Sequence, residues 1–348
     1  MADTSRSSAR GSGRLLRKVL LLSLPLVAIL VSYLVLDPFR VLRRYATFDQ
    51  RLVAVPNRDY TSTQMYLNTY ERRPHHSFIL GDSRTMAFLV RDWEPYIHDT
   101  AAFHYDASSE SLYGVWKKLQ FLEQHGARLK NVLIVGDADL LEQTHDTAAH
   151  LLRKDPRTTG SSRLRFQGAF VKAYLSNLFF YQFIRLRLTG KFRPGMRGLL
   201  ESRRIYYDPV TNDLVLPELN EEIRRDSLDF YARNERLKAA RRPGVSAAVI
   251  GPAQLRQLVA IRAIFARHQT RYHFVISPLF NQKQLNPADL AVLKRVFGAS
   301  AIHDFSGANA FTAQAGNYYE DAHYRPLVGR AILQQIYSGS FKPQEDKR

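Results

Sequence analysis

The stretch that decides the fold is SFILGDSRTMAF, residues 77–88, in which a short apolar run ends directly at Gly-Asp-Ser. Apolar runs of this length that end at a glycine are typical of buried strands in parallel sheets. The pattern recurs in NVLIVGDAD (131–139), RYHFVISPLF (271–280) and ASAIHDFSG (299–307). We therefore predict four strands, which end near Gly81, Gly136, Pro278 and Asp304.

Segments with helical spacing separate these strands. Apolar residues recur every three or four positions over 112–122, and Gly126 follows as a helix cap. The same spacing covers 252–269, and 286–298 begins with Asn-Pro and ends at a glycine, which are helix start and stop signals. Strands that alternate with helices predict an α/β fold with a mostly parallel sheet covered by helices on both faces.

Ser83 would lie at the carboxyl end of the first predicted strand, where open parallel sheets carry their functional residues. Gly81 allows a tight turn there, and Asp82 and Arg84 flank the serine. Ser83 is therefore a candidate nucleophile. The alternative is an ordinary turn serine, because Gly-Asp-Ser is short enough to occur by chance.

A candidate base lies near the C-terminus in NYYEDAHYRPLVGRAIL (317–333), where His323 follows two acids. A serine hydroxyl becomes a good nucleophile when a histidine takes its proton and a carboxylate fixes the histidine tautomer. Glu320 and Asp321 precede His323 by three and two residues, and the spacing does not choose between them. The alternative is a surface-turn histidine beside solvated acids.

Residues 19–36, VLLLSLPLVAILVSYLVL, form an uncharged run of 18 residues. As a helix this run would be about 27 Å long, just enough to cross the apolar core of a bilayer. Asp-Pro-Phe-Arg follows it where a small-residue cleavage site of a signal peptide would stand, and basic residues precede it. We predict a single-pass, uncleaved anchor in the cytoplasmic membrane, with the N-terminus inside and the bulk of the chain in the periplasm or outside the cell.

Positive charge is concentrated in one part of the chain. The formal net charge is +18, and between Arg153 and Arg197 eleven Lys and Arg residues stand against one acid, Asp155. Such a stretch, interleaved with aromatics, suits a membrane surface, an anionic polymer or nucleic acid. An external location argues against nucleic acid. The alternative is a helix with an aromatic core face and a solvated basic face.

These features together resemble the SGNH, or GDSL, hydrolase superfamily. Gly81-Asp82-Ser83 matches its first block, and Glu320-x-x-His323 is similar to its closing Asp-x-x-His block. The anchor and DFSGANAFTAQAGNYYEDAHYRPLVG (304–329) look like membrane-tethered SGNH-like proteins that acylate bacterial cell-surface polymers, as in exopolysaccharide O-acetylation and teichoic acid D-alanylation. The resemblance implies a flavodoxin-like strand order and a Ser-His-acid acyl-enzyme mechanism. It also implies an anionic or neutral surface polysaccharide and a membrane-bound acyl-donor protein as partners.

Two positions depart from the family pattern around the oxyanion hole. The second block offers only Gly114, which falls in a predicted helix, and Ala138 stands where the third block has asparagine. Losing one oxyanion donor typically costs roughly 100- to 1000-fold in rate. Asp137 and Asp139 would face the same crevice as substrate or structural ligands. The function is thus predicted as an acyltransferase or esterase, with a non-catalytic membrane-bound partner of a polysaccharide export or modification complex as the alternative.

The predicted organisation has four parts: a basic tail (1–18), the anchor (19–36), a connecting segment without a clear period (37–74) and the α/β domain (75–340). An inserted helical cap (150–245) interrupts the alternation of the last part. No metal-ligand spacing, phosphate-binding glycine loop or dinucleotide fingerprint occurs in the sequence, so we predict no metal and no cofactor.

Overall fold

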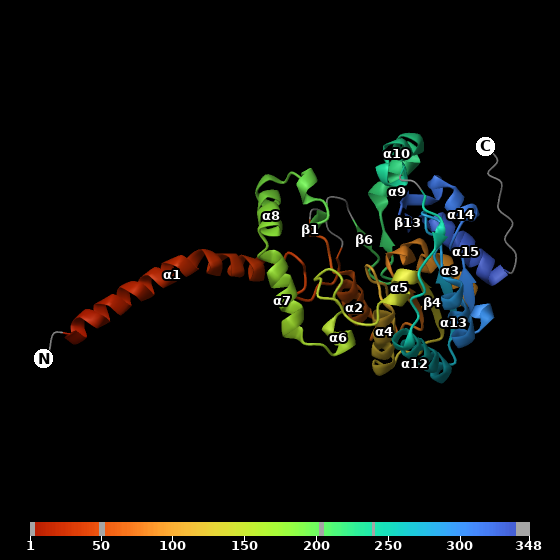
Figure 1. The fold of residues 1–348 in the computed structure, drawn as a ribbon, viewed down its shortest axis with the longest axis horizontal. Helices are drawn as coiled ribbons and strands as arrows, with labels where there is room; N and C mark the ends of the chain where they lie inside the picture. The colour runs from red at the N-terminus through yellow and green to blue at the C-terminus, as the bar shows by residue number, and fades with distance from the viewer. Residues whose placement is uncertain (1–3, 49–52, 202–204, 239–240, 339–348) are drawn as a thin grey trace.

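The computed structural model describes residues 4–48, 53–201, 205–238 and 241–338 (Figure 1). Its centre is a five-stranded sheet in the order β11-β9-β4-β2-β3, in which every neighbouring pair is parallel. These strands are β2 (Ser77–Gly81), β3 (Ala102–His104), β4 (Asn131–Gly136), β9 (Arg271–Ile276) and β11 (Ile302–Asp304). Numbered along the chain, the order is 2-1-3-4-5, a flavodoxin-like order. The predicted α/β class with a mostly parallel sheet is confirmed.

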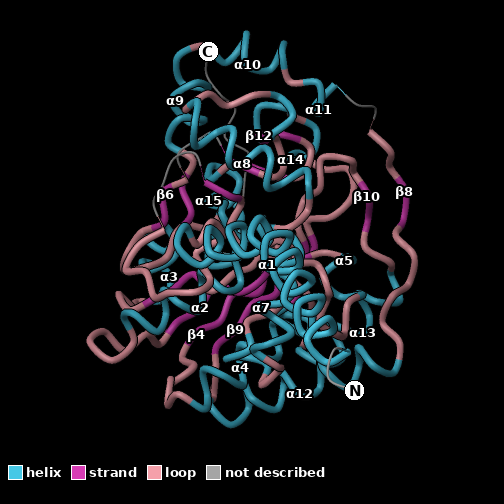
Figure 2. Tube along the Cα trace, turned by 90° about the vertical axis from the view of Figure 1, so that its left-hand side faces the viewer, coloured by secondary structure: helices cyan, strands magenta, loops and turns pink. Residues whose placement is uncertain are grey.

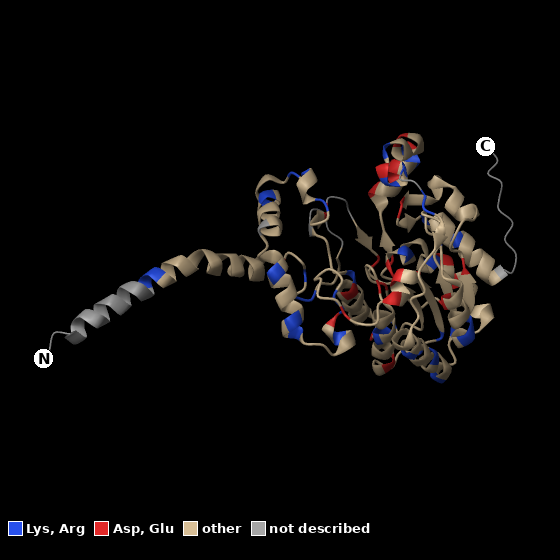
Figure 3. Ribbon diagram, viewed as in Figure 1, with Lys and Arg blue, Asp and Glu red and all other residues tan. Residues whose placement is uncertain are grey.

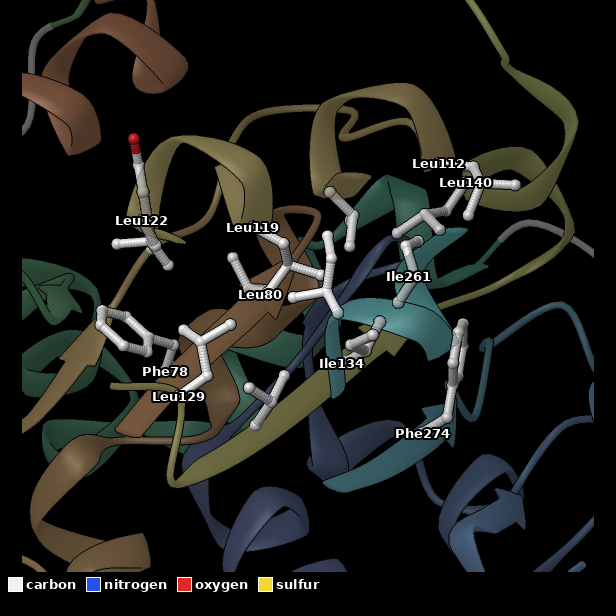
Figure 4. Close-up of a cluster of buried hydrophobic side chains, with 14 of the residues drawn as sticks. Phe78, Leu80, Leu112, Leu119, Leu122, Leu129, Ile134, Leu140, Ile261 and Phe274 are labelled. Carbon is white, nitrogen blue, oxygen red and sulfur yellow. The ribbon is translucent and has the colours of Figure 1, made fainter. Parts of the chain in front are cut away.

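Helices cover both faces of this sheet. One face carries α4 (Leu112–Gln124), α12 (Pro252–His268) and α13 (Pro287–Phe297), and the other carries α3 (Val90–Ile97) and α15 (Pro326–Ser338). The strands serve both cores by alternation, because Phe78 and Leu80 pack with the first group and Ile79 with the second. Figure 4 shows the first core, where Phe78, Leu80, Ile134 and Phe274 of the sheet meet Leu119, Leu122 and Ile261 of the helices. The helices predicted over 112–122, 252–269 and 286–298 are therefore confirmed.

The edge strand β3 was not predicted, because three residues are too few to show a period. The hairpin of β6 (Tyr206–Tyr207) and β7 (Leu214–Val215) covers its open edge. The His104 amide donates to the Thr211 carbonyl at 2.8 Å, and the Asn212 side chain donates to the His104 carbonyl at 2.6 Å. The edge is thereby closed to pairing with another strand.

The segment predicted as a connection, 37–74, contains a buried helix, α2 (Arg58–Thr69). Most of its buried side chains are polar, which explains why no apolar period marks this helix in the sequence. The Arg58 guanidinium contacts the Asp106 carboxylate at 2.6 Å and donates to the Asn212 carbonyl at 2.8 Å. This segment is consequently part of the globular domain.

A second polar cluster lies between α2 and α4, and we call Asp59, Glu110, Lys118 and Lys154 the buried charge cluster. Lys118 Nζ lies 2.6 Å from Glu110 and 3.1 Å from Asp59, and Lys154 also pairs with Glu110. All four side chains are almost fully buried. Burial opposes ionisation, but the opposite charges prevail, so that the pKa of Glu110 is lowered and that of Lys118 is raised. The cluster joins α2, α4 and the start of the insertion.

The insertion, predicted as one helical cap over 150–245, divides into two parts in Figure 1. The first part lies beside the end of α1 and contains α6 (Pro156–Thr159), α7 (Arg163–Tyr174), α8 (Asn177–Thr189), η2 (Pro194–Met196) and β5 (Leu200–Glu201), which pairs with β1 (Val53–Ala54). The second part contains β6, β7, α9 (Pro217–Arg225), α10 (Ser227–Arg233), α11 (Glu235–Lys238) and β8 (Gly244–Val245), which pairs with β10 (Lys283–Gln284). It is this second part that reaches the candidate active site.

The N-terminal helix α1 (Thr4–Leu36) projects from the domain, as Figure 1 shows. Its segment Arg17–Leu36 has 20 residues and a mean hydropathy of 2.7, and it is almost entirely unburied. It is therefore long and apolar enough to cross a membrane. Figure 2 views the molecule from the side of this helix.

Candidate active site

Ser83 begins a short 3-10 helix, η1 (Ser83–Ala87), directly after β2. Gly81 has a φ of 140°, and a Cβ placed there would lie 1.9 Å from the Val135 carbonyl oxygen, so only glycine fits this turn. Asp82 caps η1, because its side chain accepts a hydrogen bond from the Arg84 amide at 2.9 Å. The chain thus turns sharply out of the sheet and places Ser83 at its carboxyl edge.

His323 opens the strand β13 (His323–Tyr324), which pairs with β12 (Tyr318–Glu320) in a tight antiparallel hairpin. The preceding chain runs through η3 (Ala299–Ala301), α14 (Ala310–Ala313) and η4 (Ala315–Asn317). His323 Nε2 lies 2.7 Å from Ser83 Oγ, although 240 positions separate the two residues. The histidine side chain is 28% exposed and Ser83 is partly buried, so both remain accessible to a substrate.

Glu320 holds the other nitrogen of the histidine ring. Its Oε1 is hydrogen-bonded to His323 Nδ1, so Ser83, His323 and Glu320 form one hydrogen-bonded sequence. Asp321 does not take this position, because its carboxylate pairs with Arg236 Nε at 2.6 Å. The spacing left the choice between Glu320 and Asp321 open, and the structure places Glu320, not Asp321, against the histidine. The acid that precedes the histidine by three positions, rather than the one that precedes it by two, contacts the ring.

Arg236 is a site residue that the sequence did not indicate. It comes from α11 in the second part of the insertion, and its Nη2 lies 2.6 Å from Glu320 Oε2. One guanidinium thus contacts both acids of the loop and fixes Glu320 against the histidine. A single arginine in a mixed-charge run from 218 to 242 carries no pattern that would distinguish it from its neighbours.

The surroundings of Glu320 lower its pKa. Burial alone would raise the pKa, but the hydrogen bond from His323 and the charges of His323 and Arg236 outweigh it and bring the value to about 2. Asp321 differs, because burial and the neighbouring negative charge of Glu320 raise its pKa. Glu320 is therefore ionised at neutral pH, which is the state that orients a catalytic imidazole.

Arg84 connects the ends of β2 and β4 next to the serine. Its Nη1 lies 2.5 Å from Asp82 Oδ2 and 3.0 Å from Asp137 Oδ2. Burial raises the pKa of Asp82 to about 6, with Arg84 opposing this shift and Asp137 reinforcing it. Asp137 also caps α5 (Ala138–Glu142) through the Leu140 amide. Asp137, expected as a substrate or structural ligand, and the two residues that flank Ser83 are thus engaged with one another beside the serine.

Gly114 does not take part in this site. It lies in the first turn of α4, where its amide donates to Ser111 Oγ at 3.0 Å. A Cβ at Gly114 would lie 2.0 Å from Glu110 Oε1, so the absence of a side chain leaves space for the buried charge cluster. The expectation of Gly114 as an oxyanion donor is corrected, because its amide is already engaged and its neighbours belong to another part of the fold.

The helix α15 packs closely on η1, and Gly329 permits this contact. A Cβ at Gly329 would lie 1.9 Å from the Ala87 carbonyl oxygen. The sequence contained a signal for this residue, because a glycine inside an apolar helical pattern often marks a close approach of backbones. Gly329 therefore fixes the helix that carries Ser83 against the helix that follows His323.

Two cavities adjoin these elements. One of about 110 Å³ opens at the ends of β4 and β9, where Asp137 and Asp139 meet Ser246, Asn281, Lys283 and Ser306. The other, of about 210 Å³, lies between η1, β7 and the start of α15, where Met86, Leu89 and Leu216 meet Arg91, Arg325 and Arg330. Asp139 is half-buried, and burial together with the charge of Asp137 raises its pKa. Both aspartates predicted at the end of the second strand therefore line the first cavity.

Within the described ranges, no group of three or more His, Asp or Glu side chains is placed to hold a metal ion. No protein-family model matches the chain, and no curated protein matches it.

Proposed function

We propose that this chain is a serine-dependent acyltransferase or esterase of the SGNH type, anchored by α1, that acts on acyl groups of a cell-surface polysaccharide. The observation that carries the proposal is the hydrogen-bonded sequence Ser83–His323–Glu320 at the carboxyl edge of a parallel sheet. A turn serine and a surface histidine that met by chance would not require the buried supports of Gly81 and Gly329.

The proposed reaction follows from this geometry. Ser83 Oγ attacks the carbonyl carbon of an acyl ester while His323 Nε2 takes the hydroxyl proton. The bond between the acyl carbon and the leaving oxygen then breaks, and His323 returns the proton to that oxygen. An acceptor hydroxyl or water next gives its proton to His323 and attacks the acyl-serine, which releases Ser83 with its proton restored. Glu320 stabilises the imidazolium in both steps.

The oxyanion hole sets the expected speed. Ala138 is the first residue of α5, and its methyl group cannot donate the hydrogen bond that the family's asparagine supplies. The Arg84 amide already donates to Asp82, so we assign the role of oxyanion donor to the Ser83 amide. We expect turnover roughly 100- to 1000-fold slower than in an enzyme with the full set of donors.

The two cavities support a glycan substrate. The cavity beside Asp139 offers carboxylate, hydroxyl, amide and ammonium groups, which suit the many hydroxyls of a sugar. The cavity beside η1 combines three arginines with an apolar floor, which suits an anionic group. An anionic polymer segment, or a neutral one in the first cavity alone, is therefore the proposed acceptor, and a membrane-bound acyl-donor protein is the proposed source of the acyl group.

The proposal is tested with the purified full chain and an activated acetyl ester. We expect ester turnover and an acetyl group on the peptide that contains Ser83, with transfer to a glycan acceptor when one is added. Ser83→Ala and His323→Ala should each remove turnover by roughly 10⁴-fold or more while the protein stays folded. Ser227→Ala, at an exposed serine of α10, serves as the control and should retain turnover.

Unchanged turnover in folded Ser83→Ala would overturn the proposal. The departure at Ala138 favours a second candidate, a non-catalytic membrane-bound partner in polymer export or modification. That candidate predicts that cells with both Ser83→Ala and His323→Ala keep normal polymer acylation. A reporter fused to the C-terminus tests sidedness, since activity inside the cell alone would contradict both candidates.

A further inference from the structure

The last turns of α1 are packed against the first part of the insertion. Ser32 Oγ lies 2.9 Å from the Tyr174 hydroxyl, and the rings of Tyr33 and Tyr174 are 5.2 Å apart. Ile29 and Leu36 join the same aromatic cluster with residues of α7 and α8. The C-terminal third of the apolar helix is thus fixed to the domain.

The helices α7 and α8 run across the direction of α1 at the side from which it leaves the domain (Figure 1). The inner side of each packs in the aromatic cluster, through Phe166, Phe170 and Tyr174 of α7 and Phe179, Phe183 and Leu186 of α8. A second apolar set lies away from this cluster and is exposed; we call Leu164, Leu175, Leu178, Tyr181 and Leu188 the outer stripe. Helices that are apolar on two sides require a second apolar environment.

The outer stripe is a concentrated feature. Outside α1, five of the nine large apolar side chains that are exposed in the described part of the chain belong to it. Basic residues lie on the same two helices and directly after them, namely Arg163, Arg165 and Lys172 on α7, Arg185 and Arg187 on α8, and Lys191 and Arg193 after α8. No acid occurs between residues 160 and 200, and Figure 3 shows basic but no acidic positions on both helices. This combination of exposed apolar and basic side chains is typical of helices that lie in a membrane interface.

The length of the apolar helix determines how deeply the end of α7 lies in the membrane. The uncharged run 19–36 spans about 27 Å at ~1.5 Å per residue, close to the apolar thickness of a bilayer. When the whole segment lies in the bilayer, Ser32 is about 6 Å inside the boundary at Leu36. Because Tyr174 is hydrogen-bonded to Ser32, the end of α7 must enter the membrane with it.

We propose that α7 and α8 form an interfacial platform whose outer stripe inserts among the headgroups of an anionic phospholipid bilayer, with the surrounding Arg and Lys residues binding those headgroups. This inference rests on α1 crossing the membrane, which belongs to the proposed function, but not on acyl transfer. Two independent contacts with the bilayer, α1 and the platform, fix the orientation of the domain. The candidate active site lies farther from α1 than the platform does, as β13 in Figure 1 shows.

The absence of cysteine from the chain makes the test direct, since one introduced cysteine carries one nitroxide label. Leu164→Cys, Leu178→Cys and Leu188→Cys are labelled in the full chain and reconstituted into vesicles that contain phosphatidylglycerol. Leu228→Cys on α10 is the matched control, because Leu228 is 84% exposed and Leu164 is 85% exposed. Collisions of the label with oxygen, which concentrates in lipid, and with a water-soluble nickel complex are measured by electron paramagnetic resonance.

We expect oxygen collisions to dominate at the three outer-stripe positions and nickel collisions to dominate at position 228. Equal, water-like behaviour at all four positions would overturn the proposal, and would assign the stripe to a protein partner that the vesicles lack. Replacing phosphatidylglycerol with phosphatidylcholine should raise nickel collisions at the stripe several-fold, and an unchanged depth would contradict the role of the basic residues. Ser83→Ala should leave every depth unchanged, so a failed acyl assay and a failed depth measurement are separate results.

Discussion

Two of the clusters of ionisable side chains in the described part of the chain can be compared: the hydrogen-bonded series around His323 and the buried charge cluster around Lys118. Both join segments that are distant in sequence, and both contain groups with shifted pKa values. In the buried charge cluster each charge is balanced and inaccessible, because Lys118 lies between Asp59 and Glu110. Around His323 the series of hydrogen bonds ends at the hydroxyl of Ser83, which is partly exposed.

The difference teaches how a reactive site is distinguished from a structural one. A shifted pKa is common to both, so it does not decide the matter. A reactive site differs from a structural cluster in that the last group of its hydrogen-bonded series is accessible to a substrate. By this criterion we expect Ser83 to react, whereas Lys118 holds α2 against α4.

The sharpest test of this comparison separates the two acids beside His323. Glu320→Gln should reduce acyl turnover by roughly 10³- to 10⁴-fold, because the amide no longer stabilises the imidazolium. Asp321→Asn is the matched control and should lower turnover less than about tenfold, since Asp321 contacts Arg236 and not the histidine. Turnover of the acetyl ester, measured for both variants at one pH, checks this expectation. Equal losses in the two variants would return Asp321 to the catalytic role.

Substitutions in the buried charge cluster should change the free energy of unfolding, not the chemistry of acyl transfer. Lys118→Met removes the cation that balances two buried carboxylates, so the free energy of unfolding should fall by about 3 to 5 kcal/mol. Lys117→Met, at the neighbouring residue whose ammonium contacts Gln120, should change it by less than about 1 kcal/mol. Denaturant titration of the full chain measures both. A stable Lys118→Met variant that has lost acyl turnover would instead make the cluster part of the reactive site.

A substitution at Gly329 tests whether the close contact between α15 and η1 supports both the fold and the reactivity of Ser83. Gly329→Ala places a methyl group against the Ala87 carbonyl and should cost about 1 to 3 kcal/mol of stability, with a loss of turnover as η1 shifts. Gly168→Ala in α7 is the control, because a Cβ placed there would meet no described atom within 4 Å, and it should stabilise slightly. Thermal unfolding and ester turnover are compared for the pair. A Gly329→Ala variant with normal turnover would show that the contact supports only the fold.

The smallest expected effect concerns pH. The folded protein lowers the pKa of Glu320 from 4.5 to about 2, so the unfolded chain takes up the proton first as the pH falls. The contribution of Glu320 to stability is therefore complete above about pH 4.5 and disappears as the pH falls towards 2. The stability difference between the unsubstituted chain and Glu320→Gln, measured by denaturant titration between about pH 6 and about pH 3, should shrink with falling pH. A difference that stays constant or grows would contradict the assigned shift.

The sequence predicted the layers of the fold because apolar periodicity marks buried strands and helices directly. Four of the five strands of the sheet and the helices over 112–122, 252–269 and 286–298 follow from it. β3 was missed because its three residues, Ala102–His104, show no period, and α2 was missed because most of its buried side chains are polar. Apolar periodicity predicts elements that are buried through apolar side chains, and it does not mark elements that are held in place by polar contacts.

The candidate site was predicted in part for a similar reason. Ser83 follows the first strand of the sheet and His323 lies in the segment after its last strand, β11, so the topology could bring them to the same edge. The choice of Glu320 depends on the exact turn between β12 and β13, and the contact of Arg236 depends on how the insertion folds back. Gly114 was misplaced because glycine can serve many purposes, and here it makes room for Glu110.

The joint at the end of α1 has a mechanical consequence. Asp37 accepts hydrogen bonds from the Val41 amide and the Tyr45 hydroxyl, so the chain folds back at once instead of continuing as a loose linker. A flexible tether lets an enzyme search a volume that grows with linker length. A rigid connection removes that search and holds the carboxyl edge of the sheet at one distance from α1 and in one orientation about it. Under the proposed function, substrates must then be delivered to that edge, which favours neighbours that bring a polymer past a fixed point.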